Sequence, residues 1–174
     1  MSSNPATSNI YLAADHAGFA LKNTLVAFLR ARGYTVEDLG AHDLSPEDDY
    51  PDFVTPCAKR VAQENPRTGA AQVFGIVIGG SGQGEAMAAN RVPGVRAAVF
   101  YGDAHAPGTV DAEGTPAAKD GLDIIRLTRA HNDANVLSFG ARFVSDEEAE
   151  RAALLFLSTP FSGGARHIRR ISKY

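Results

Sequence analysis

The segment from residue 75 to residue 90 carries the residue types and the spacing best suited to chemistry. A short apolar run there ends in a loop with glycine at positions 79, 80, 82 and 84, and Glu85 follows directly, ahead of a helix-forming stretch. Glycines let a backbone approach a ligand closely and turn successive N–H groups toward one point, and a helix N-terminus adds partial positive charge. The segment therefore predicts a strand, an anion-binding loop and a helix start.

The loop does not match either of the common nucleotide-binding fingerprints. In the register of G-x-x-x-x-G-K-[ST] that begins at Gly79, Glu85 stands where the phosphate-binding lysine belongs and Ala86 where the magnesium-binding hydroxyl belongs. The dinucleotide pattern G-x-G-x-x-G/A fails because Glu85 or Met87 occupies the position of a small residue. A glycine nest beside a carboxylate suits a reaction in which a base removes a proton while an oxyanion develops. A tight turn with a surface glutamate at a helix start is the alternative.

Apolar residues recur in a pattern that alternates strands with helices. Short apolar runs predict five strands, the last three of them buried, at 10–14, 34–39, 74–78, 97–100 and 136–139. Helical spacing, and a capping box at Ser145, predict further helices at 21–32, 53–61, 145–158 and 165–173. This alternation implies an α/β fold with a doubly wound parallel sheet and right-handed crossovers.

Three loops of this pattern should meet in one crevice. In doubly wound sheets, ligands bind outside the carboxyl ends of the strands. Asp15 and His16, the glycine loop, and the segment 140–142 each follow a predicted strand directly. We therefore expect these segments to form one site.

Length and composition exclude several classes of protein. A chain of 174 residues suits a single domain, and 44% hydrophobic residues, 21% charged residues and a net charge of -3 describe a soluble globular protein rather than a nucleic-acid or membrane binder. The single Cys57 excludes an internal disulfide, fits a reducing compartment and lies on a core-facing helical stripe. The five histidines lack close ligand spacing, so no metal site is expected. Residues 1–8 do not resemble a signal peptide and are expected to form a flexible tail, which favours a cytoplasmic location.

Residues 102–121 interrupt the alternating pattern. This segment is rich in proline and glycine and has few apolar residues. Loops of that length are either functional lids or tolerated insertions. We interpret the segment as an insertion within a single domain that spans 1–174, and we expect that it can be shortened with little loss of stability. A lid or specificity loop is the alternative.

Five short motifs along the chain point to one family. They are Asp15-His16-Ala-Gly, Asp49-Tyr50-Pro51, the loop from Gly79 to Asn90, His131-Asn132-Asp-Ala-Asn and Arg166-His167-x-x-Arg170. In order and spacing they resemble the ribose-5-phosphate isomerase B type of sugar-phosphate isomerases, which includes galactose-6-phosphate isomerases. The resemblance implies a Rossmann-like three-layer α/β/α sandwich with a five-stranded parallel sheet. It also implies a homodimer or tetramer with active sites shared between subunits, and neither a metal nor an organic cofactor.

The resemblance implies a role for each motif residue. One branch of the family has a cysteine base at the head of the glycine loop, where this chain has Gly79, and the other branch has a glutamate just after the loop, as at Glu85. Glu85 is then the base that shuttles a proton between carbons 1 and 2 of the sugar through a cis-enediolate. The other implied roles are oxyanion stabilisation by Ser81 and the N–H groups near Gly80, Gly82 and Gly84, ring opening by Asp15 and His131, lining of the pocket by Asn132 and Tyr50, and phosphate binding by His16, Arg142, Arg166 and Arg170.

Several of these residues have a simpler alternative role. Asp15 could cap the first helix, and His131 could cap a helix end. Arg166 and Arg170 are four residues apart on one helical face and could form a solvated basic edge. Two guanidiniums on one face also suit a phosphate, because each offers forked donors. In a net acidic chain, this basic stripe is too short to indicate nucleic-acid binding.

Three classes of function remain open. The leading hypothesis is an aldose-ketose isomerase that interconverts ribose 5-phosphate and ribulose 5-phosphate. Galactose 6-phosphate, allose 6-phosphate or a tetrulose phosphate are alternative substrates, because the resemblance spans enzymes for sugars of four to six carbons. A non-catalytic sugar-phosphate sensor on the same fold is the second class, and Glu85 argues against it. A nucleotide-dependent oxidoreductase is disfavoured by the two failed fingerprints.

Overall fold

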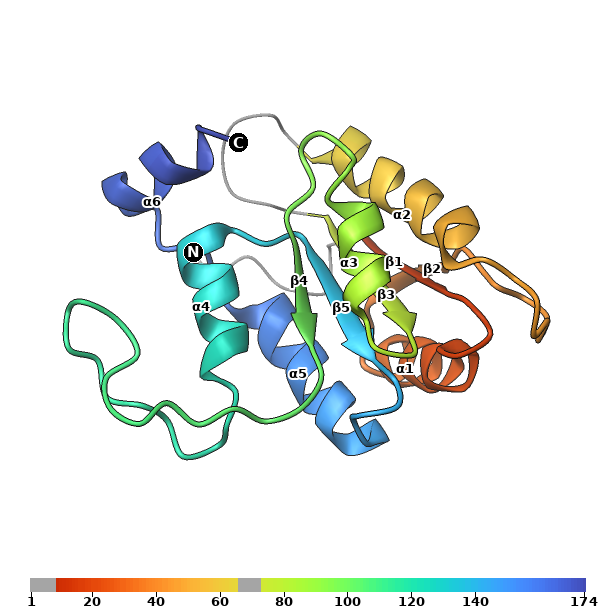
Figure 1. Cartoon of the computed structure of the whole chain (residues 1–174), viewed down its shortest axis with the longest axis horizontal. Coiled ribbons are helices and arrows are strands. Elements are labelled where there is room, and N and C mark those ends of the chain that lie inside the picture. Colours follow the sequence, from red (N-terminus) through yellow and green to blue (C-terminus); the bar gives the residue numbers. More distant parts are fainter. Residues whose placement is uncertain (1–8, 66–72) are drawn as a thin grey trace.

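The computed structural model describes residues 9–65 and 73–174, in which strands and helices alternate (Figure 1). The strands are β1 (Asn9–Ala14), β2 (Thr35–Asp38), β3 (Phe74–Gly79), β4 (Ala97–Phe100) and β5 (Val136–Gly140). The helices are α1 (Phe19–Ala31), α2 (Tyr50–Glu64), α3 (Gln83–Ala89), α4 (Asp123–Asn132), α5 (Asp146–Ser158) and α6 (Ala165–Ile171). Within the described ranges, no helix has both the length and the apolar character needed to cross a bilayer.

The five strands form one parallel sheet in the order β2-β1-β3-β5-β4. The chain leaves β1 for β2 at one edge and then returns past β1 to β3. The strand order therefore reverses direction between β1 and β3. In sheets of this kind ligands bind outside the carboxyl ends of the strands at such a reversal, and we call this region the crevice. The loops that follow β1 and β3 carry the first and third of the predicted motifs.

Two separate hydrophobic cores make the sheet the middle layer of a three-layer α/β/α sandwich (Figure 1). Along β1, Ile10 and Leu12 pack into the core that includes α1 and α5, and Tyr11 and Ala13 pack into the core that includes α2 and α3. Successive strand residues point to opposite faces, so a strand in the middle of the sheet is apolar at every position. The predicted fold class is confirmed.

The structure differs from the sequence-based expectation in two elements. Residues 97–100 were expected to form a buried strand, but Ala97, Ala98 and Val99 are only half-buried because β4 lies at the edge of the sheet. Helix α4 was not predicted, because its buried side includes the charged side chains of Asp123 and Arg129 and its apolar pattern is correspondingly weak. The predicted tail, residues 1–8, lies outside the described residues.

Two local predictions are confirmed. Ser145 Oγ accepts a hydrogen bond from the N–H of Glu148, and the Glu148 carboxylate accepts one from the N–H of Ser145, so a capping box opens α5. Cys57 is fully buried in the core between the sheet and α2, where burial raises the pKa of its thiol to about 12. The thiol is therefore a packing group that stays protonated at neutral pH.

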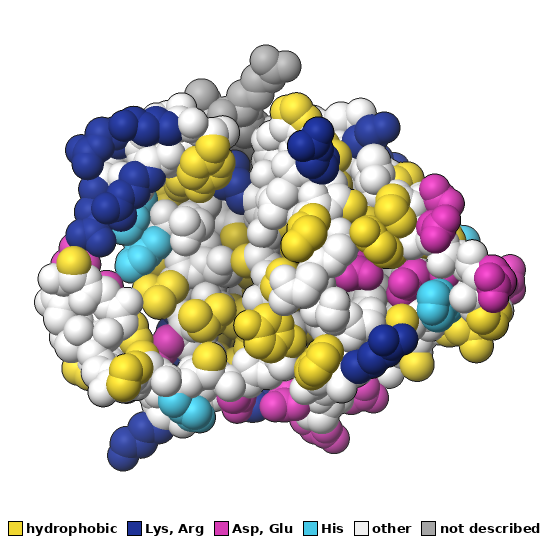
Figure 2. All heavy atoms as spheres, in the orientation of Figure 1, with side chains coloured by type: hydrophobic (Ala, Val, Ile, Leu, Met, Phe, Trp, Pro, Cys, Tyr) yellow, Lys and Arg dark blue, Asp and Glu magenta, His cyan; other side chains and the backbone are white. Residues whose placement is uncertain are grey.

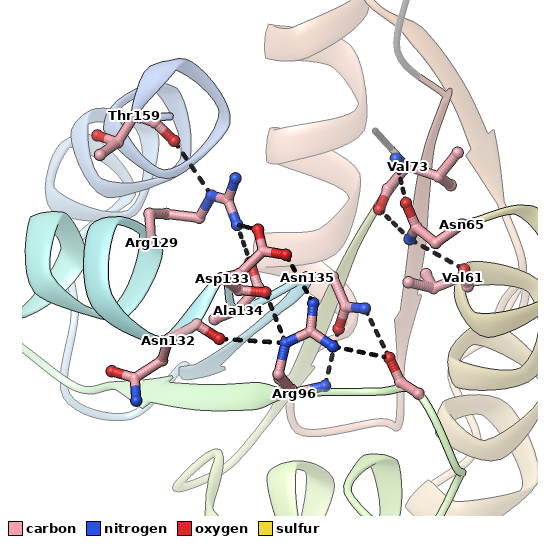
Figure 3. A network of polar contacts seen from close by, with 11 residues as sticks. Val61, Asn65, Val73, Arg96, Arg129, Asn132, Asp133, Ala134, Asn135 and Thr159 are labelled. Atoms are coloured by element: carbon pink, nitrogen blue, oxygen red, sulfur yellow. Dashed lines mark hydrogen bonds and ion pairs between the residues drawn. The ribbon is translucent and has the colours of Figure 1, made fainter. Parts of the chain in front are cut away.

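A buried ion-pair network fixes the turn between α4 and β5 (Figure 3). The Asp133 carboxylate accepts hydrogen bonds from Arg129 Nη1 at 2.8 Å and from Arg96 Nη2 at 2.9 Å. The side chains of Arg129 and Asp133 are 2% and 4% exposed. Burial lowers the pKa of the Arg129 guanidinium, and the Asp133 carboxylate opposes this effect. The network holds the end of α4, which includes His131 and Asn132.

Replacing Asp133 should destabilise the fold strongly. The substitution Asp133→Ala leaves the Arg129 guanidinium buried without its carboxylate, which costs about 3–5 kcal/mol in comparable buried pairs. Denaturant unfolding measures this loss. The matched control is Asp103→Ala, which removes a partly exposed contact of 3.4 Å with Arg151 and should cost less than about 1 kcal/mol. Equal losses in the two variants would contradict the role given to the network.

Candidate active site

The glycine loop joins β3 to α3 at the carboxyl edge of the sheet. Gly82 has a φ of 75°, in the left-handed region that favours glycine. Ser138 Oγ, on β5, donates a hydrogen bond to the Gly82 carbonyl at 2.7 Å. A Cβ added at Gly82 would lie 2.9 Å from the Phe139 carbonyl carbon. The loop therefore packs directly on the end of β5.

The other glycines of the loop leave room for functional side chains. An added Cβ would lie 1.7 Å from Oε1 of Glu85 at position 79, 3.1 Å from Cζ of Arg142 at position 80, and 2.8 Å from Oη of Tyr50 at position 84. The first and last of these distances are shorter than any real Cβ contact, and the second is tight. A carboxylate, a guanidinium and a phenol thus lie against the main chain at three positions that have no side chain. Ser81, between them, is exposed, and its Oγ accepts a hydrogen bond from the N–H of Gln83 at 3.4 Å.

Glu85 is a buried carboxylate in the first turn of α3. Its side chain is only 4% exposed. Burial raises the pKa of this carboxyl group and the nearby charge of Asp15 raises it further, while a hydrogen bond with its own main chain acts in the opposite direction. A carboxylate with a raised pKa is a stronger base than one in water, so Glu85 is suited to removing a proton from a bound molecule.

Asp15 follows β1 and is also buried, at 6% exposure. Its Oδ1 accepts hydrogen bonds from the N–H groups of Ala17 at 3.0 Å and Gly18 at 3.2 Å, so it holds the turn that leads into α1. The Asp15 side chain thus shapes the turn before α1, but it does not cap the helix, because the N-cap residue is Gly18 and no side-chain hydrogen bond in the described part of the chain caps α1. This arrangement also keeps the carboxylate within electrostatic reach of Glu85.

His16 is held by Asp48, a residue that sequence reasoning did not select. Asp48 Oδ1 lies 2.6 Å from His16 Nδ1 and accepts a hydrogen bond from the His16 main-chain N–H at 3.0 Å. This contact raises the pKa of the His16 imidazole, partial burial opposes it, and the charge of Asp15 adds to it. The motif Asp49-Tyr50-Pro51 pointed to the right segment, but Asp49 is exposed and its neighbour Asp48 turns inward.

The same three groups are the only candidate metal ligands clustered within the described ranges. Ligand atoms of Asp15, His16 and Asp48 lie within 4.8 Å of one another. The His16 ring already pairs with Asp48, and Asp15 Oδ1 already accepts two main-chain hydrogen bonds. His16 and Asp48 therefore pair with each other, Asp15 is held by the main chain, and Asp48 Oδ2 is buried without a hydrogen-bond partner among the described residues. The two carboxylates favour a positive charge on His16.

Removing the Asp48 carboxylate should lower the pKa of His16. In Asp48→Asn the imidazolium loses its anionic partner, so His16 becomes neutral at a lower pH than in the unmodified protein. A titration followed by NMR of the histidine ring protons measures this change. Asp49→Asn removes the adjacent exposed carboxylate and should leave the His16 titration unchanged. If the Asp48 variant titrates as the unmodified protein does, the assigned contact is wrong.

The remaining predicted site residues lie at the other end of the sheet. His131 and Asn132 end α4 just before β5 begins, whereas the crevice lies where the strands end. Figure 1 shows α6, which carries Arg166 and Arg170, on the side away from the arrowheads of the strands. A single chain therefore brings together Asp15, His16, Tyr50, the glycine loop with Glu85, and Arg142, but not the other four residues.

These four residues belong to a second polar cluster, formed by the end of α4 and by α6. The rings of His131 and His167 stack at 4.2 Å with an interplanar angle of 12°. Burial lowers the pKa of His167, and the nearby His131, Arg166 and Arg170 add to this effect. Figure 2 shows Lys and Arg side chains gathered on this part of the surface with histidine beside them. The cluster has the chemistry of an anion site, but it faces away from the crevice of its own chain.

Comparisons with known proteins identify the family of this chain. A model of the Ribose/Galactose Isomerase family matches residues 10–113 and 121–174. Ribose-5-phosphate isomerase B of Mycolicibacterium paratuberculosis is 35% identical over 162 residues, covering 93% of this chain and 86% of that protein. The crystal structure of ribose-5-phosphate isomerase B from Mycoplasma genitalium with bound ribulose-5-phosphate matches with a TM-score of 0.79 at 35% identity, covering 96% of this chain and 93% of the other. The enzyme of the same name from Thermotoga maritima matches with a TM-score of 0.77 at 35% identity, covering 96% and 97%.

The fold and these matches define an α/β isomerase. In the structure, the buried Glu85 carboxylate lies against the main chain of the glycine loop. The chain belongs to the ribose/galactose isomerase family. The resemblance noted in the sequence is thereby confirmed.

Proposed function

We propose that the protein interconverts ribose 5-phosphate and ribulose 5-phosphate. Family membership supports the reaction class, and the relatives named for this substrate cover nearly the whole chain. The observation that carries the proposal is the buried Glu85 carboxylate against Gly79 at the carboxyl end of β3. A non-catalytic sensor would have no need for a buried carboxylate with a raised pKa.

The proposed reaction transfers one carbon-bound proton between neighbouring carbons. Glu85 removes the proton from carbon 2 of the open-chain aldose, and the electrons shift to the carbonyl oxygen to form a cis-enediolate. Ser81 and the main-chain N–H groups of the glycine loop stabilise this oxyanion. Glu85 then returns the proton to carbon 1, while the oxygen-bound proton moves from oxygen 2 to oxygen 1. Asp15 and His131 open the furanose ring before this step.

The proposed substrate contacts divide between the two polar clusters. His16 and Arg142 lie at the crevice, with Tyr50 against the loop. Arg166 and Arg170 lie on α6 and would bind the phosphate together with them, with Asn132 lining the pocket. The geometry sets no length for the sugar, so galactose 6-phosphate, allose 6-phosphate and a tetrulose phosphate are the alternative substrates to compare in one coupled assay.

We propose that two copies of the chain complete each site as a homodimer. Helix α6 of each copy would lie at the crevice of the other copy, because a two-fold axis repeats every contact between two surfaces in both directions. Met87, Tyr101 and Phe143 are 67%, 56% and 61% exposed, an unusual exposure for such large apolar side chains. Figure 2 shows hydrophobic side chains spread over the face in front of β4 and α3. A groove of about 430 Å³ near α6, lined in part by Arg96 and Tyr174, adds a concave surface for a partner.

The proposed reaction needs no metal and no organic cofactor. A carboxylate base and an oxyanion-stabilising loop supply the proton transfer and the charge stabilisation. We place the enzyme in the cytoplasm, with neither a membrane nor a nucleic acid as partner. The buried, protonated thiol of Cys57 is compatible with a reducing compartment.

Replacing the base tests the chemistry. Glu85→Gln preserves shape and removes the basic oxygen, so kcat should fall by at least about a hundredfold, since positioned bases contribute about 10² to 10⁴-fold. Substrate affinity and melting temperature should change little. Deuterium exchange from solvent into carbon 2 should fall in parallel with kcat. Near-normal isomerisation by this variant would move the base elsewhere, with Asp15 as the next candidate.

Mixing two inactive variants tests the shared site. When Glu85→Gln and Arg170→Ala chains are coexpressed, a mixed dimer has one site with both changes and one site with neither. Random pairing should therefore restore roughly one quarter of normal activity, far above either parent. Sedimentation of the mixture as a dimer is the accompanying measurement. If activity stays at the level of the parents, Glu85 and Arg170 act within one chain or in separate processes.

A further inference from the structure

The insertion at residues 102–121 has a defined structure of its own. Thr109 and Pro116 form an antiparallel bridge, and the N–H of Val110 donates to the Thr115 carbonyl at 2.8 Å. Asp111 Oδ1 accepts hydrogen bonds from the N–H groups of Glu113 at 3.1 Å and Thr115 at 2.9 Å. The tip of the insertion is therefore a small hairpin turn shaped by Asp111.

The insertion is also anchored at its base. Ala104 bridges Leu122, and the N–H of Ala118 donates to Asp123 Oδ2 at 2.7 Å. Arg126, on α4, forms ion pairs with both Asp120 and Asp123. The family model does not match residues 114–120, so the tip includes sequence outside the family pattern. Because these contacts fix the base of the insertion, the side chains at its tip have defined positions.

Two carboxylates of the tip lie near the second polar cluster. Hydrogen bonds from Thr115 lower the pKa of Asp111 and the nearby His131 adds to this effect, while Glu113 makes a direct contact. Glu113 Oε1 lies 2.9 Å from Arg166 Nη1 and forms an ion pair with it. The Arg166 side chain is 36% exposed and the Glu113 side chain 60% exposed, so both groups remain in contact with water. Among the described residues, Arg170 on the same helix forms no ion pair. The insertion thus brings a negative charge to one of the two arginines assigned to phosphate.

We infer that Glu113 lowers the affinity of the site for sugar phosphates by competing with the substrate's phosphate for Arg166. The inference rests on the proposed function, which assigns that arginine to the phosphate. A phosphate dianion offers the guanidinium two oxygens and more charge than one carboxylate, so it displaces Glu113 on binding. Because the ion pair between Glu113 and Arg166 is lost when phosphate binds, the net binding free energy gained from the contact of phosphate with Arg166 is smaller. The insertion therefore raises the KM for phosphorylated sugars and leaves the proton-transfer step unchanged.

Removing the competing charge should strengthen phosphate binding. In Glu113→Gln, the dissociation constant for inorganic phosphate, measured by calorimetry, and the KM for ribose 5-phosphate should both fall by about two- to fivefold, the range of exposed ion pairs. The value of kcat should stay the same. Glu147→Gln removes an exposed carboxylate from the first turn of α5 and should change neither constant. Phosphate affinity that is unchanged or weaker in the Glu113 variant would overturn the inference.

A second background separates this inference from the proposed function. In Arg166→Ala, phosphate affinity should fall at least about tenfold, and adding Glu113→Gln should then have no further effect, because the pair no longer exists. If Arg166→Ala binds phosphate normally, the phosphate assignment in the proposed function fails. If Arg166→Ala weakens binding but Glu113→Gln alone does not strengthen it, only the competition by Glu113 fails. The salt dependence is an independent test. The difference in phosphate affinity between Glu113→Gln and the unmodified protein should become smaller at 1 M ionic strength, where the Debye length is about 3 Å.

Discussion

The site depends on keeping the Glu85 carboxylate out of water, and this burial raises its pKa. Glu85 and Asp15 are both buried at the junction of β1 and β3, and their charges repel each other. Main-chain N–H groups at the start of α1 stabilise the Asp15 carboxylate, so the unfavourable environment acts on Glu85. The sheet makes the arrangement feasible, because parallel strands bring their carboxyl ends, and the loops that follow them, to one edge.

Much of the fold could be predicted because the buried strands and helices carry strong apolar patterns. Ile10 to Ala14 and Phe74 to Ile78 are apolar at almost every position, as expected for strands covered on both faces. The Ser145 capping box marked the start of α5 at a defined residue. The glycine loop was recognisable as the link between β3 and α3, because the sequence shows glycines after an apolar run and an acidic residue directly after them.

Other parts depend on contacts that the sequence does not display. Helix α4 buries Arg129 against Asp133, and a charged residue in a buried position hides the helical pattern. Asp48 and Asp49 are chemically identical neighbours, and only the backbone direction before α2 decides which one contacts His16. The ion pair between Glu113 and Arg166 joins residues 53 positions apart through an insertion whose path has no apolar signature.

The contact between position 79 and Glu85 also constrains how this family can evolve. The resemblance implies two branches, one with a cysteine base at the head of the loop and one with a glutamate base after it. Because a Cβ at position 79 would lie 1.7 Å from Glu85 Oε1, the two bases would occupy the same space. A side chain at position 79 would therefore displace the Glu85 carboxylate from its present position. Positions 79 and 85 are therefore expected to change together between the two branches.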